Sequence, residues 1–527
     1  MPILTVGPNS TFPSIADAMA AAGPNDTIQL EGGYSNETAT VTHSGMIVAG
    51  EANSTGIVLR LATGIAVVTL AGNAPIDLFD AADGNAITGN DGDNVVRVSA
   101  GSDAVSGGGG HDRLVVDYRL ATGAVTGDSA SNFTEAGGGA RMVTVNGGFE
   151  DFTIVTGSGA DTITTGDGDD IIRTHGGAGT ITAGQGANYI VGGDGADTIT
   201  ASDGGNFVRG GDGENTITTG GGSDEIVTGA DADTVVSGGG ADRITVVGGA
   251  DSVDAGAGDD RLVLDYSAAI TSVSGGVESG NAATGYTGHI ADLAGATLDF
   301  VGVESFRIMT GAGDDSIRTG AGADLFYGGD GNDRFETGQN DDRAYGEAGD
   351  DWVAASGGDD LLDGGAGRDL LYGEGGLDLL VGGGGDDRLA GGSDADKLLG
   401  GNGNDTIIGG TGRDGINGGT GSDQFVFAAG DTGTTALTAD RIVDFSHADG
   451  DKIHLGQIDA DTRTAADDAF TFIGTGAFAG NGAAGQLRYD VIGGNRFIEG
   501  DVDGDGAADF SIRLDGAQHL VSTDFIL

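Results

Sequence analysis

Aspartates recur at every ninth position over a long stretch in the second half of the chain. The thirteen residues are Asp315, Asp324, Asp333, Asp342, Asp351, Asp360, Asp369, Asp378, Asp387, Asp396, Asp405, Asp414 and Asp423. Each fills the sixth position of the pattern Gly-Gly-x-Gly-x-Asp-x-hydrophobic-x, which is clearest in residues 382–390, 400–408 and 418–426. Carboxylates together with turn carbonyls form an all-oxygen ligand set, which suits Ca²⁺ better than Mg²⁺ or Zn²⁺. The spacing therefore predicts a row of calcium sites.

The residue types around each aspartate indicate the backbone that would position it. Glycine tolerates the strained conformations of a tight turn, so the first six positions of each unit are expected to form a turn. The last three form a short strand whose middle, apolar residue points inward. Two units make one coil of about eighteen residues, and aspartates of alternate units then face each other ~4.8 Å apart, with a cation between them. We therefore predict an all-β parallel β-helix or β-roll solenoid.

A second run of twelve nonapeptides covers residues 156–263, and its later units keep the aspartate. These aspartates are Asp224, Asp233, Asp242, Asp251 and Asp260. Four earlier units lack it and carry Gly179, Asn188, Asn206 and Asn215 instead. Asparagine offers only a neutral carbonyl and glycine offers no ligand, so we predict weak or absent calcium binding there. The remaining aspartates of those units, Asp161, Asp170 and Asp197, are doubtful ligands.

The charge balance of the chain favours folding that is coupled to metal binding. There are 81 acidic and 23 basic residues, a net charge of −58, and 108 glycines among 527 residues. Such a chain repels itself, so divalent ions along the turns would couple binding to folding. The same acidity argues against nucleic acid and anionic membrane surfaces as partners. The absence of cysteine excludes disulfides and thiolate metal sites.

Repeat phase and composition predict seven parts along the chain. They are an N-terminal cap with the first coils (1–79), degenerate repeats (80–115), a β-rich insert (116–155), nonapeptides (156–263), a second β-rich insert (264–309), the main nonapeptide block (310–426) and a C-terminal β cap (427–527). Residues 12–22 are alanine-rich, which predicts a helix in the N-terminal cap. The two inserts begin alike, with DRLVVDY at 112–118 and DRLVLDY at 260–266, which indicates an internal duplication.

Four aspartates near the C-terminal end form a further candidate metal site. Asp501, Asp503, Asp505 and Asp509 follow the pattern D-x-D-x-D-G-x-x-D. This pattern matches the first half of an EF-hand loop, but Ile512 stands where the bidentate glutamate would be. We predict a partial calcium loop, and a plain acidic turn is the alternative.

Threonine pairs recur every eighteen residues in the second run. They are Thr162/Thr164, Thr180/Thr182, Thr198/Thr200 and Thr216/Thr218. On a solenoid they would form a ladder with spacings of ~6.7 Å along a strand and ~4.8 Å between strands, similar to the threonine arrays of ice-binding solenoids. The alternative is that threonine simply favours strands and pairs well across them.

The nonapeptide is similar to the calcium-binding signature of RTX proteins. Residues 310–527 resemble the C-terminal part of serralysin-type metalloproteases and other type I secreted RTX proteins, with DRIVDF at 440–445 and GDKIHL at 450–455. The resemblance implies a terminal cap that carries an export signal at residues 524–527. Residues 1–79 resemble the N-terminal cap of right-handed β-helix proteins of the pectate lyase type. The chain has no H-E-x-x-H motif, so the resemblance implies no protease activity.

These patterns favour a secreted protein, because calcium outside the cell fills low-affinity sites. The N-terminus lacks a basic region followed by an apolar run, so we expect type I secretion. The expected role is structural: a surface-layer, matrix, filament or adhesin component that assembles on Ca²⁺ with copies of itself or cell-surface polysaccharide, without membrane insertion. The alternatives are a polysaccharide lyase or epimerase, and an ice- or polysaccharide-binding module. The seven histidines are isolated in sequence, and we predict no catalytic residue.

Overall fold

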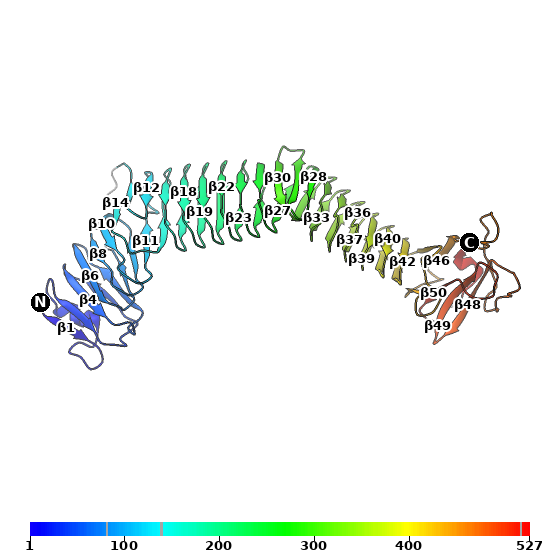
Figure 1. Cartoon of the computed structure of the whole chain (residues 1–527), viewed down its shortest axis with the longest axis horizontal. Coiled ribbons are helices and arrows are strands. Elements are labelled where there is room, and N and C mark those ends of the chain that lie inside the picture. The colour runs from blue at the N-terminus through cyan, green and yellow to red at the C-terminus, as the bar shows by residue number, and fades with distance from the viewer. Residues whose placement is uncertain (81–82, 138–140, 517–518) are drawn as a thin grey trace. The chain divides into compact units, whose positions relative to one another are not determined.

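The structure, a computed structural model, describes residues 1–80, 83–137, 141–516 and 519–527. It divides into two compact units, Met1–Asp260 and Arg261–Leu527. Each unit is a parallel β-solenoid in which strands of successive coils pair with one another (Figure 1). The predicted all-β solenoid is therefore confirmed. Among the described residues, no helix has both the length and the apolar character that a membrane span requires.

Two sheets run along the first unit. One contains β1 (Ile3–Val6), β2 (Thr27–Leu30), β4 (Met46–Gly50), β6 (Val67–Gly72), β8 (Ala86–Thr88), β10 (Gly101–Ser106), β12 (Val125–Asp128), β13 (Asn132–Glu135), β14 (Arg141–Val145), β16 (Thr162–Thr164), β18 (Thr180–Ala183), β20 (Thr198–Ala201), β22 (Thr216–Thr218), β24 (Thr234–Val236) and β26 (Ala250–Asp254). The other contains β3 (Thr38–Val41), β5 (Ile57–Leu61), β7 (Ile76–Phe79), β9 (Val95–Val98), β11 (Arg113–Asp117), β15 (Asp151–Val155), β17 (Ile171–Arg173), β19 (Tyr189–Asp194), β21 (Phe207–Asp212), β23 (Glu225–Val227) and β25 (Arg243–Val246).

The helix α1 (Ile15–Ala21) covers the first coils of this unit. Ser14 caps the helix, because its hydroxyl oxygen accepts the amide hydrogen of Asp17 at 3.0 Å. Ile15, Ala18 and Met19 are buried, and the helix contacts β1, β2 and β3. The end of a solenoid exposes an apolar rung that needs such a cover. The predicted helix-containing cap is confirmed.

The second unit also has two sheets. One contains β28 (Val273–Asn281), β29 (Gly285–Asp292), β30 (Thr297–Val303), β32 (Ser316–Arg318), β34 (Arg334–Glu336), β36 (Trp352–Ala354), β38 (Leu370–Gly375), β40 (Arg388–Ser393), β42 (Thr406–Thr411), β44 (Gln424–Ala428), β46 (Lys452–Gln457) and β51 (Phe525–Ile526). The other contains β27 (Arg261–Ala269), β31 (Ser305–Ala312), β33 (Leu325–Asp330), β35 (Arg343–Ala348), β37 (Leu361–Ala366), β39 (Leu379–Gly384), β41 (Lys397–Asn402), β43 (Gly415–Thr420), β45 (Asp440–Ile442), β47 (Thr471–Phe472), β48 (Gln486–Ile492), β49 (Asn495–Asp501) and β50 (Phe510–Leu514). A short 3₁₀ helix covers Ser522–Asp524.

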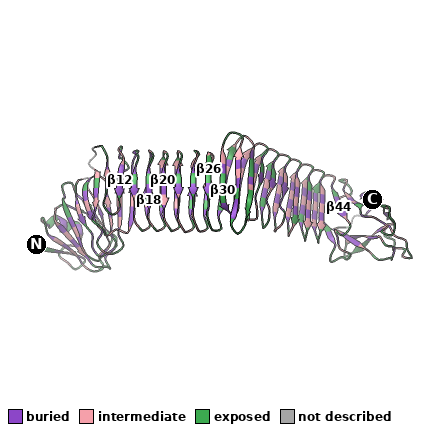
Figure 2. Cartoon of the chain, turned by 45° about the horizontal axis from the view of Figure 1, so that its top comes forward, coloured by how far each residue is buried: buried purple, intermediate pink, exposed green. Residues whose placement is uncertain are grey.

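The core consists of the apolar residue at position eight of each nonapeptide. Leu371 pairs with Leu389, and Leu389 pairs with Ile407, across β38, β40 and β42. All three side chains are fully buried, whereas the residues beside them are partly or fully exposed. Buried positions occur beside intermediate and exposed ones on the strands of the solenoid (Figure 2). This alternation follows from the strand geometry, in which successive side chains point to opposite faces. Since each nonapeptide contributes a single core side chain at position eight, which at Ala344 is only a methyl group, the turns must supply much of the remaining stabilisation.

Antiparallel strands interrupt the parallel ladder in both predicted inserts. β12, β13 and β14 pair antiparallel in the first unit, and β28, β29 and β30 do so in the second. Each group returns to the parallel ladder, through the pairs β12–β16 and β28–β32. The boundary between the two compact units falls inside the predicted segment 156–263. The seven-part division remains a prediction.

The C-terminal cap, residues 427–527, is built onto the last coil. β45 pairs with β43 on one side and with β50 on the other, and β46 lies between β44 and β51. β48, β49 and β50 then form an antiparallel group. The predicted C-terminal β cap is thus present in the second unit.

Candidate metal centre

The phased aspartates of the second unit form two columns, with one aspartate per coil in each. The amide of Asp351 donates to Oδ1 of Asp369 at 2.8 Å, and the amide of Asp369 donates to Oδ1 of Asp387 at 2.9 Å. The same bond joins all column neighbours from Asp315 to Asp423. The carboxylates therefore follow one another head to tail. One oxygen of each carboxylate is bound to the backbone of the coil before, so only the other oxygen is left for a cation.

The second carboxylate oxygen is buried and has no hydrogen-bond partner among the residues that the structure describes. This holds for Oδ2 of all thirteen aspartates from Asp315 to Asp423, and for Asp224, Asp242 and Asp251 in the first unit. None of the thirteen residues is more than 3 % exposed. A buried carboxylate oxygen without a partner is strongly unfavourable. We call the turn that holds each of these carboxylates a corner of the solenoid. Each corner therefore needs a cation or a proton to bind this oxygen.

The glycine at position one leaves space beside this oxygen. A Cβ atom at Gly328 would lie 2.1 Å from Oδ2 of Asp333 and 2.7 Å from the carbonyl oxygen of Gly346. The same arrangement recurs at Gly346, Gly373, Gly382, Gly391 and Gly400. Two oxygens from adjacent coils thus converge on the space that a side chain would fill. A hard cation that prefers oxygen ligands fits this space.

Burial also changes how readily these carboxylates ionise. Desolvation raises the pKa of Asp333 and of Asp405 to about 7, and that of Asp342 to about 8. The amide of the preceding coil lowers each pKa, and the neighbouring carboxylates of the column raise it again. A bound cation removes both the desolvation cost and the repulsion. Protons and cations therefore compete for the same corners.

This pattern of glycine turns and buried aspartates matches a known family. The family described as RTX calcium-binding nonapeptide repeat (4 copies) matches overlapping segments that together cover residues 80–115, 153–265 and 307–432. The matched segments span slightly more than half of the chain. The chain belongs to the RTX repeat family. RTX nonapeptides are calcium-binding motifs, so Ca²⁺ is the metal that this protein binds.

Comparison with curated proteins gave no match. Among solved structures, this RTX protein is similar to the AlgE6R3 subunit of the mannuronan C5-epimerase of Azotobacter vinelandii. The identity is 24 % and the TM-score is 0.17, over 36 % of this chain and 78 % of that chain.

Three RTX corners of the first unit satisfy their oxygens with an asparagine amide. Nδ2 of Asn206 donates to the carbonyl oxygens of Ser202 at 3.0 Å and Gly204 at 2.9 Å. Asn188 and Asn215 make the equivalent bonds to the turn carbonyls four and two residues earlier. In these corners an N–H group bonds oxygens that a cation would otherwise bind. This is a physical reason for the weak or absent calcium binding that we predict there.

The remaining aspartates of the first unit differ in their second oxygen. Oδ2 of Asp233 accepts the amide hydrogen of Gly229 at 2.9 Å, so this predicted ligand is already satisfied. Asp161 is similar, because its Oδ2 accepts a threonine hydroxyl hydrogen. Oδ2 of Asp170 and of Asp197 has no partner within the described parts of the chain. The geometry therefore favours these two doubtful ligands over Asp161 and Asp233.

The predicted ligands do not include four aspartates that occupy equivalent corners. Asp103 and Asp112 lie in the degenerate repeats, and each accepts an amide hydrogen from the coil before it. Asp440 and Asp451 continue the two columns beyond the last nonapeptide. The sequence does indicate Asp440 and Asp451 as position-six aspartates. Each is followed by a basic residue and then by an apolar residue, as at positions seven and eight of several nonapeptides. The nine-residue spacing had already ended there, which concealed this pattern.

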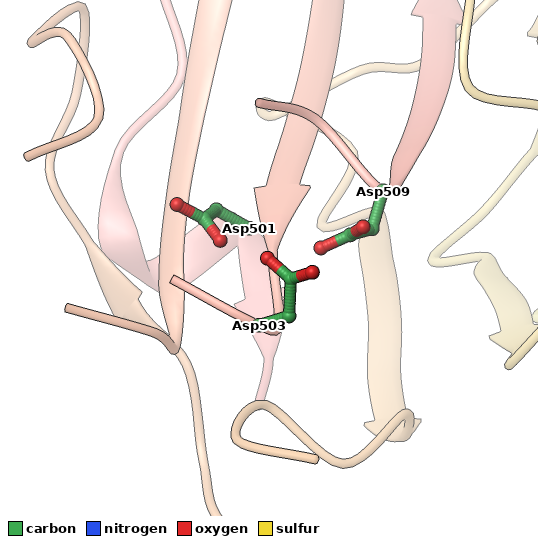
Figure 3. A group of neighbouring side chains, drawn as sticks. All are labelled: Asp501, Asp503 and Asp509. Carbon is green, nitrogen blue, oxygen red and sulfur yellow. The ribbon is translucent and has the colours of Figure 1, made fainter. Parts of the chain in front are cut away.

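The predicted partial EF-hand loop brings three of its four aspartates together. Carboxylate oxygens of Asp501, Asp503 and Asp509 lie within 4.8 Å of one another, between the end of β49 and the start of β50 (Figure 3). Asp501 is fully buried and accepts two amide hydrogens of the loop. Asp505 lies outside this group, and its Oδ1 accepts the amide hydrogen of Ala507 at 2.7 Å. Three convergent carboxylates make the loop a separate candidate calcium site.

The threonine ladder is in register on one face of the first unit. Thr162, Thr180, Thr198 and Thr216 pair directly across β16, β18, β20 and β22. Thr126 on β12 and Thr234 on β24 extend this column at either end. The second column, which starts at Thr164, is interrupted by Val236. This face therefore has one threonine column from Thr126 to Thr234 and a shorter second column from Thr164 to Thr218.

Three histidines that are isolated in sequence have acidic partners among the described residues. Nδ1 of His111 lies 3.8 Å from Oδ2 of Asp151. Nδ1 of His289 lies 2.7 Å from Oδ1 of Asp299, and His447 contacts Asp524. His289 also lines a groove of about 380 Å³. The other charged residues of this groove are Glu278, Arg318, Arg334 and Glu336. The antiparallel pairing of β29 with β30 creates the His289–Asp299 contact, which the spacing in sequence did not predict.

Proposed function

We propose that this RTX protein is an extracellular structural protein that folds and assembles when calcium fills its corners. The observation that carries this proposal is the buried carboxylate oxygen without a partner, repeated from Asp315 to Asp423 in the part of the chain that the structure describes. Calcium is abundant outside cells, where it fills sites of low affinity. RTX repeats are also typical of secreted proteins, which fits export by type I secretion.

As ligands we propose Oδ2 of the thirteen aspartates from Asp315 to Asp423, together with that of Asp224, Asp242 and Asp251. A turn carbonyl oxygen of the next coil faces the same space, as Gly346 does for Asp333. Ca²⁺ takes six to eight oxygen ligands, so further turn carbonyls would complete each site. Asp501, Asp503 and Asp509 would hold a separate ion in the C-terminal cap.

The outer faces support a role in assembly. Strand residues at positions seven and nine repeat in register from coil to coil, as the threonine column from Thr162 to Thr216 illustrates. Repeating faces of this kind suit contacts with a second copy or with a regular cell-surface polysaccharide. The regular turns of the nonapeptide blocks leave little room for the long loops from which catalytic sites are built.

The groove beside His289 favours a second candidate, which is action on an acidic polysaccharide. Arg318 and Arg334 would neutralise a uronate carboxylate, and His289, oriented by Asp299, would transfer a proton. The assay is the absorbance of unsaturated uronate on alginate or pectin. A rise that His289→Ala abolishes would favour this candidate over the structural role.

The test of the structural role compares the purified chain in calcium and in chelator, by circular dichroism and electron microscopy. At pH 8 we expect calcium to increase the β-structure content strongly, and we expect ordered polymers to form only with calcium. Asp387→Asn should raise the calcium concentration needed for folding, because it removes a charged oxygen from a buried corner. Asp386→Asn is the matched control, because Asp386 is exposed and asparagine keeps an oxygen for the amide of Asn404. A chain that is equally ordered in chelator would contradict the proposal.

A further inference from the structure

The two aspartate columns continue past the last nonapeptide into the C-terminal cap. The amide of Asp414 donates to Oδ1 of Asp440 at 2.9 Å, and the amide of Asp423 donates to Oδ1 of Asp451 at 3.0 Å. These partners are 26 and 28 residues apart, whereas neighbours inside the block are 18 residues apart. The family match ends at residue 432, before either aspartate. Corners of the RTX type therefore occur on strands that no nonapeptide encodes.

The two terminal corners differ in their second oxygen. Oδ2 of Asp451 accepts the amide hydrogen of Ser446 at 2.7 Å, so this carboxylate is satisfied by the backbone. Asp440 is fully buried, and its Oδ2 has no hydrogen-bond partner within residues 1–80, 83–137, 141–516 and 519–527. Oδ2 of Asp414, one coil earlier, is buried and unpartnered in the same way. Of the two columns, only the one that ends at Asp440 therefore has, within the cap, a carboxylate oxygen that is still available to bind a cation.

The surroundings of Asp440 are rich in oxygen. The hydroxyl oxygen of Thr432 accepts the amide hydrogen of Asp440 at 3.0 Å and donates to the carbonyl oxygen of Ser511 at 2.7 Å. The hydroxyl oxygen of Ser511 is itself buried without a partner among the described residues. Burial raises the pKa of Asp440 to about 7, although the amide of Asp414 and the hydroxyl of Thr432 lower it. The nearby carboxylate of Asp431 raises this pKa further, and Arg413 lowers it. Oxygen donors of this kind favour Ca²⁺.

We propose that Asp414 and Asp440 hold a further calcium ion, which joins the last coil of the roll to the C-terminal cap. This inference rests on the proposed calcium ligation at the RTX corners. Asp440 begins β45, which pairs with β50, and β50 pairs with β49. An ion at Asp440 would therefore hold β45 in place, and the antiparallel strands β48, β49 and β50 of the cap pack onto β45 through β50. The cap would then depend on calcium for its order, although it contains no nonapeptide.

The experiment uses the full chain with Asp440→Asn, and Asp451→Asn as the matched control. Both aspartates end a column, both are buried, and both accept an amide hydrogen from the coil before. Bound calcium per chain is counted by equilibrium dialysis, and hydrogen exchange is measured for β39, β49 and β50 in calcium. We expect Asp440→Asn to bind about one ion fewer and to lose protection in β49 and β50. Protection in β39 should persist, which shows that the roll still folds.

Asp451→Asn should keep the full calcium count of the parent chain. The same exchange experiment on the parent chain should show that chelator removes protection from β50. An Asp440→Asn chain with an unchanged calcium count and unchanged protection in β50 would overturn the inference while leaving the roll sites intact. A parent chain that binds no calcium at all would instead refute the proposed function, so the two failures are distinguishable.

Discussion

The calcium-free protein should become less stable as the pH rises from 5 to 8. Burial raises the pKa of Asp369, Asp396 and Asp405 to about 7, from an ordinary value of 3.8. A carboxyl whose pKa is higher in the folded state binds its proton more tightly there. Its contribution to stability is complete below about pH 4 and is lost as the pH rises through 7.

The size of the effect follows from these shifts. A shift of three pKa units corresponds to roughly 4 kcal/mol. Part of each shift comes from neighbouring carboxylates that titrate together, which reduces this to roughly 2 kcal/mol per carboxyl. Three such groups contribute roughly 6 kcal/mol, which is comparable with the total stability of many domains. Repulsion within a chain of net charge −58 acts in the same direction.

The assay is urea unfolding of the chelator-treated chain, followed by circular dichroism at pH 5, 6, 7 and 8. We expect the free energy of unfolding to fall by several kcal/mol across this range. With saturating calcium the fall should disappear, because the cation takes the place of the proton. Equal or greater stability of the calcium-free chain at pH 8 would refute the reasoning about the buried oxygens.

Two further predictions concern single residues. Asn206→Asp replaces the side-chain amide that donates to the carbonyl oxygens of Ser202 and Gly204 with a carboxylate. The variant should therefore bind about one more calcium ion per chain, measured by equilibrium dialysis. Unchanged calcium binding would contradict our interpretation of the asparagine corners. Leu389→Ala should lower the free energy of unfolding in calcium by about 2–5 kcal/mol, because Leu389 is fully buried between neighbouring coils. Leu377→Ala is the control, since Leu377 is 57 % exposed, and an equal loss in both variants would contradict the proposed core.

The periodic part of the fold was predictable because one rule repeats. The apolar residue at position eight, as at Leu371 and Leu389, follows from strand alternation, and the position of the aspartate follows from the glycine turn. Calcium as the metal follows from the oxygen ligands. These features depend only on local spacing, so the sequence determines them coil by coil.

The details that were missed depend on contacts between coils. The amide of one coil donates to Oδ1 of the aspartate in the next coil, which leaves a single oxygen of each carboxylate for a cation. Asp233 is satisfied by the amide of Gly229, although its position in the repeat is the same as that of Asp224. Asp440 lies in a corner that the lost nine-residue spacing concealed. The His289–Asp299 contact depends on a hairpin register.

The most direct test of the central claim is an experimental structure of the chain with bound calcium. We expect metal density at the corners of the main block, with Oδ2 of aspartates such as Asp333 and Asp405 at about 2.3–2.6 Å from the ion. The asparagine corners at Asn188, Asn206 and Asn215 should hold no ion. Aspartate corners that stay empty at saturating calcium, or calcium bound elsewhere on the surface, would contradict it.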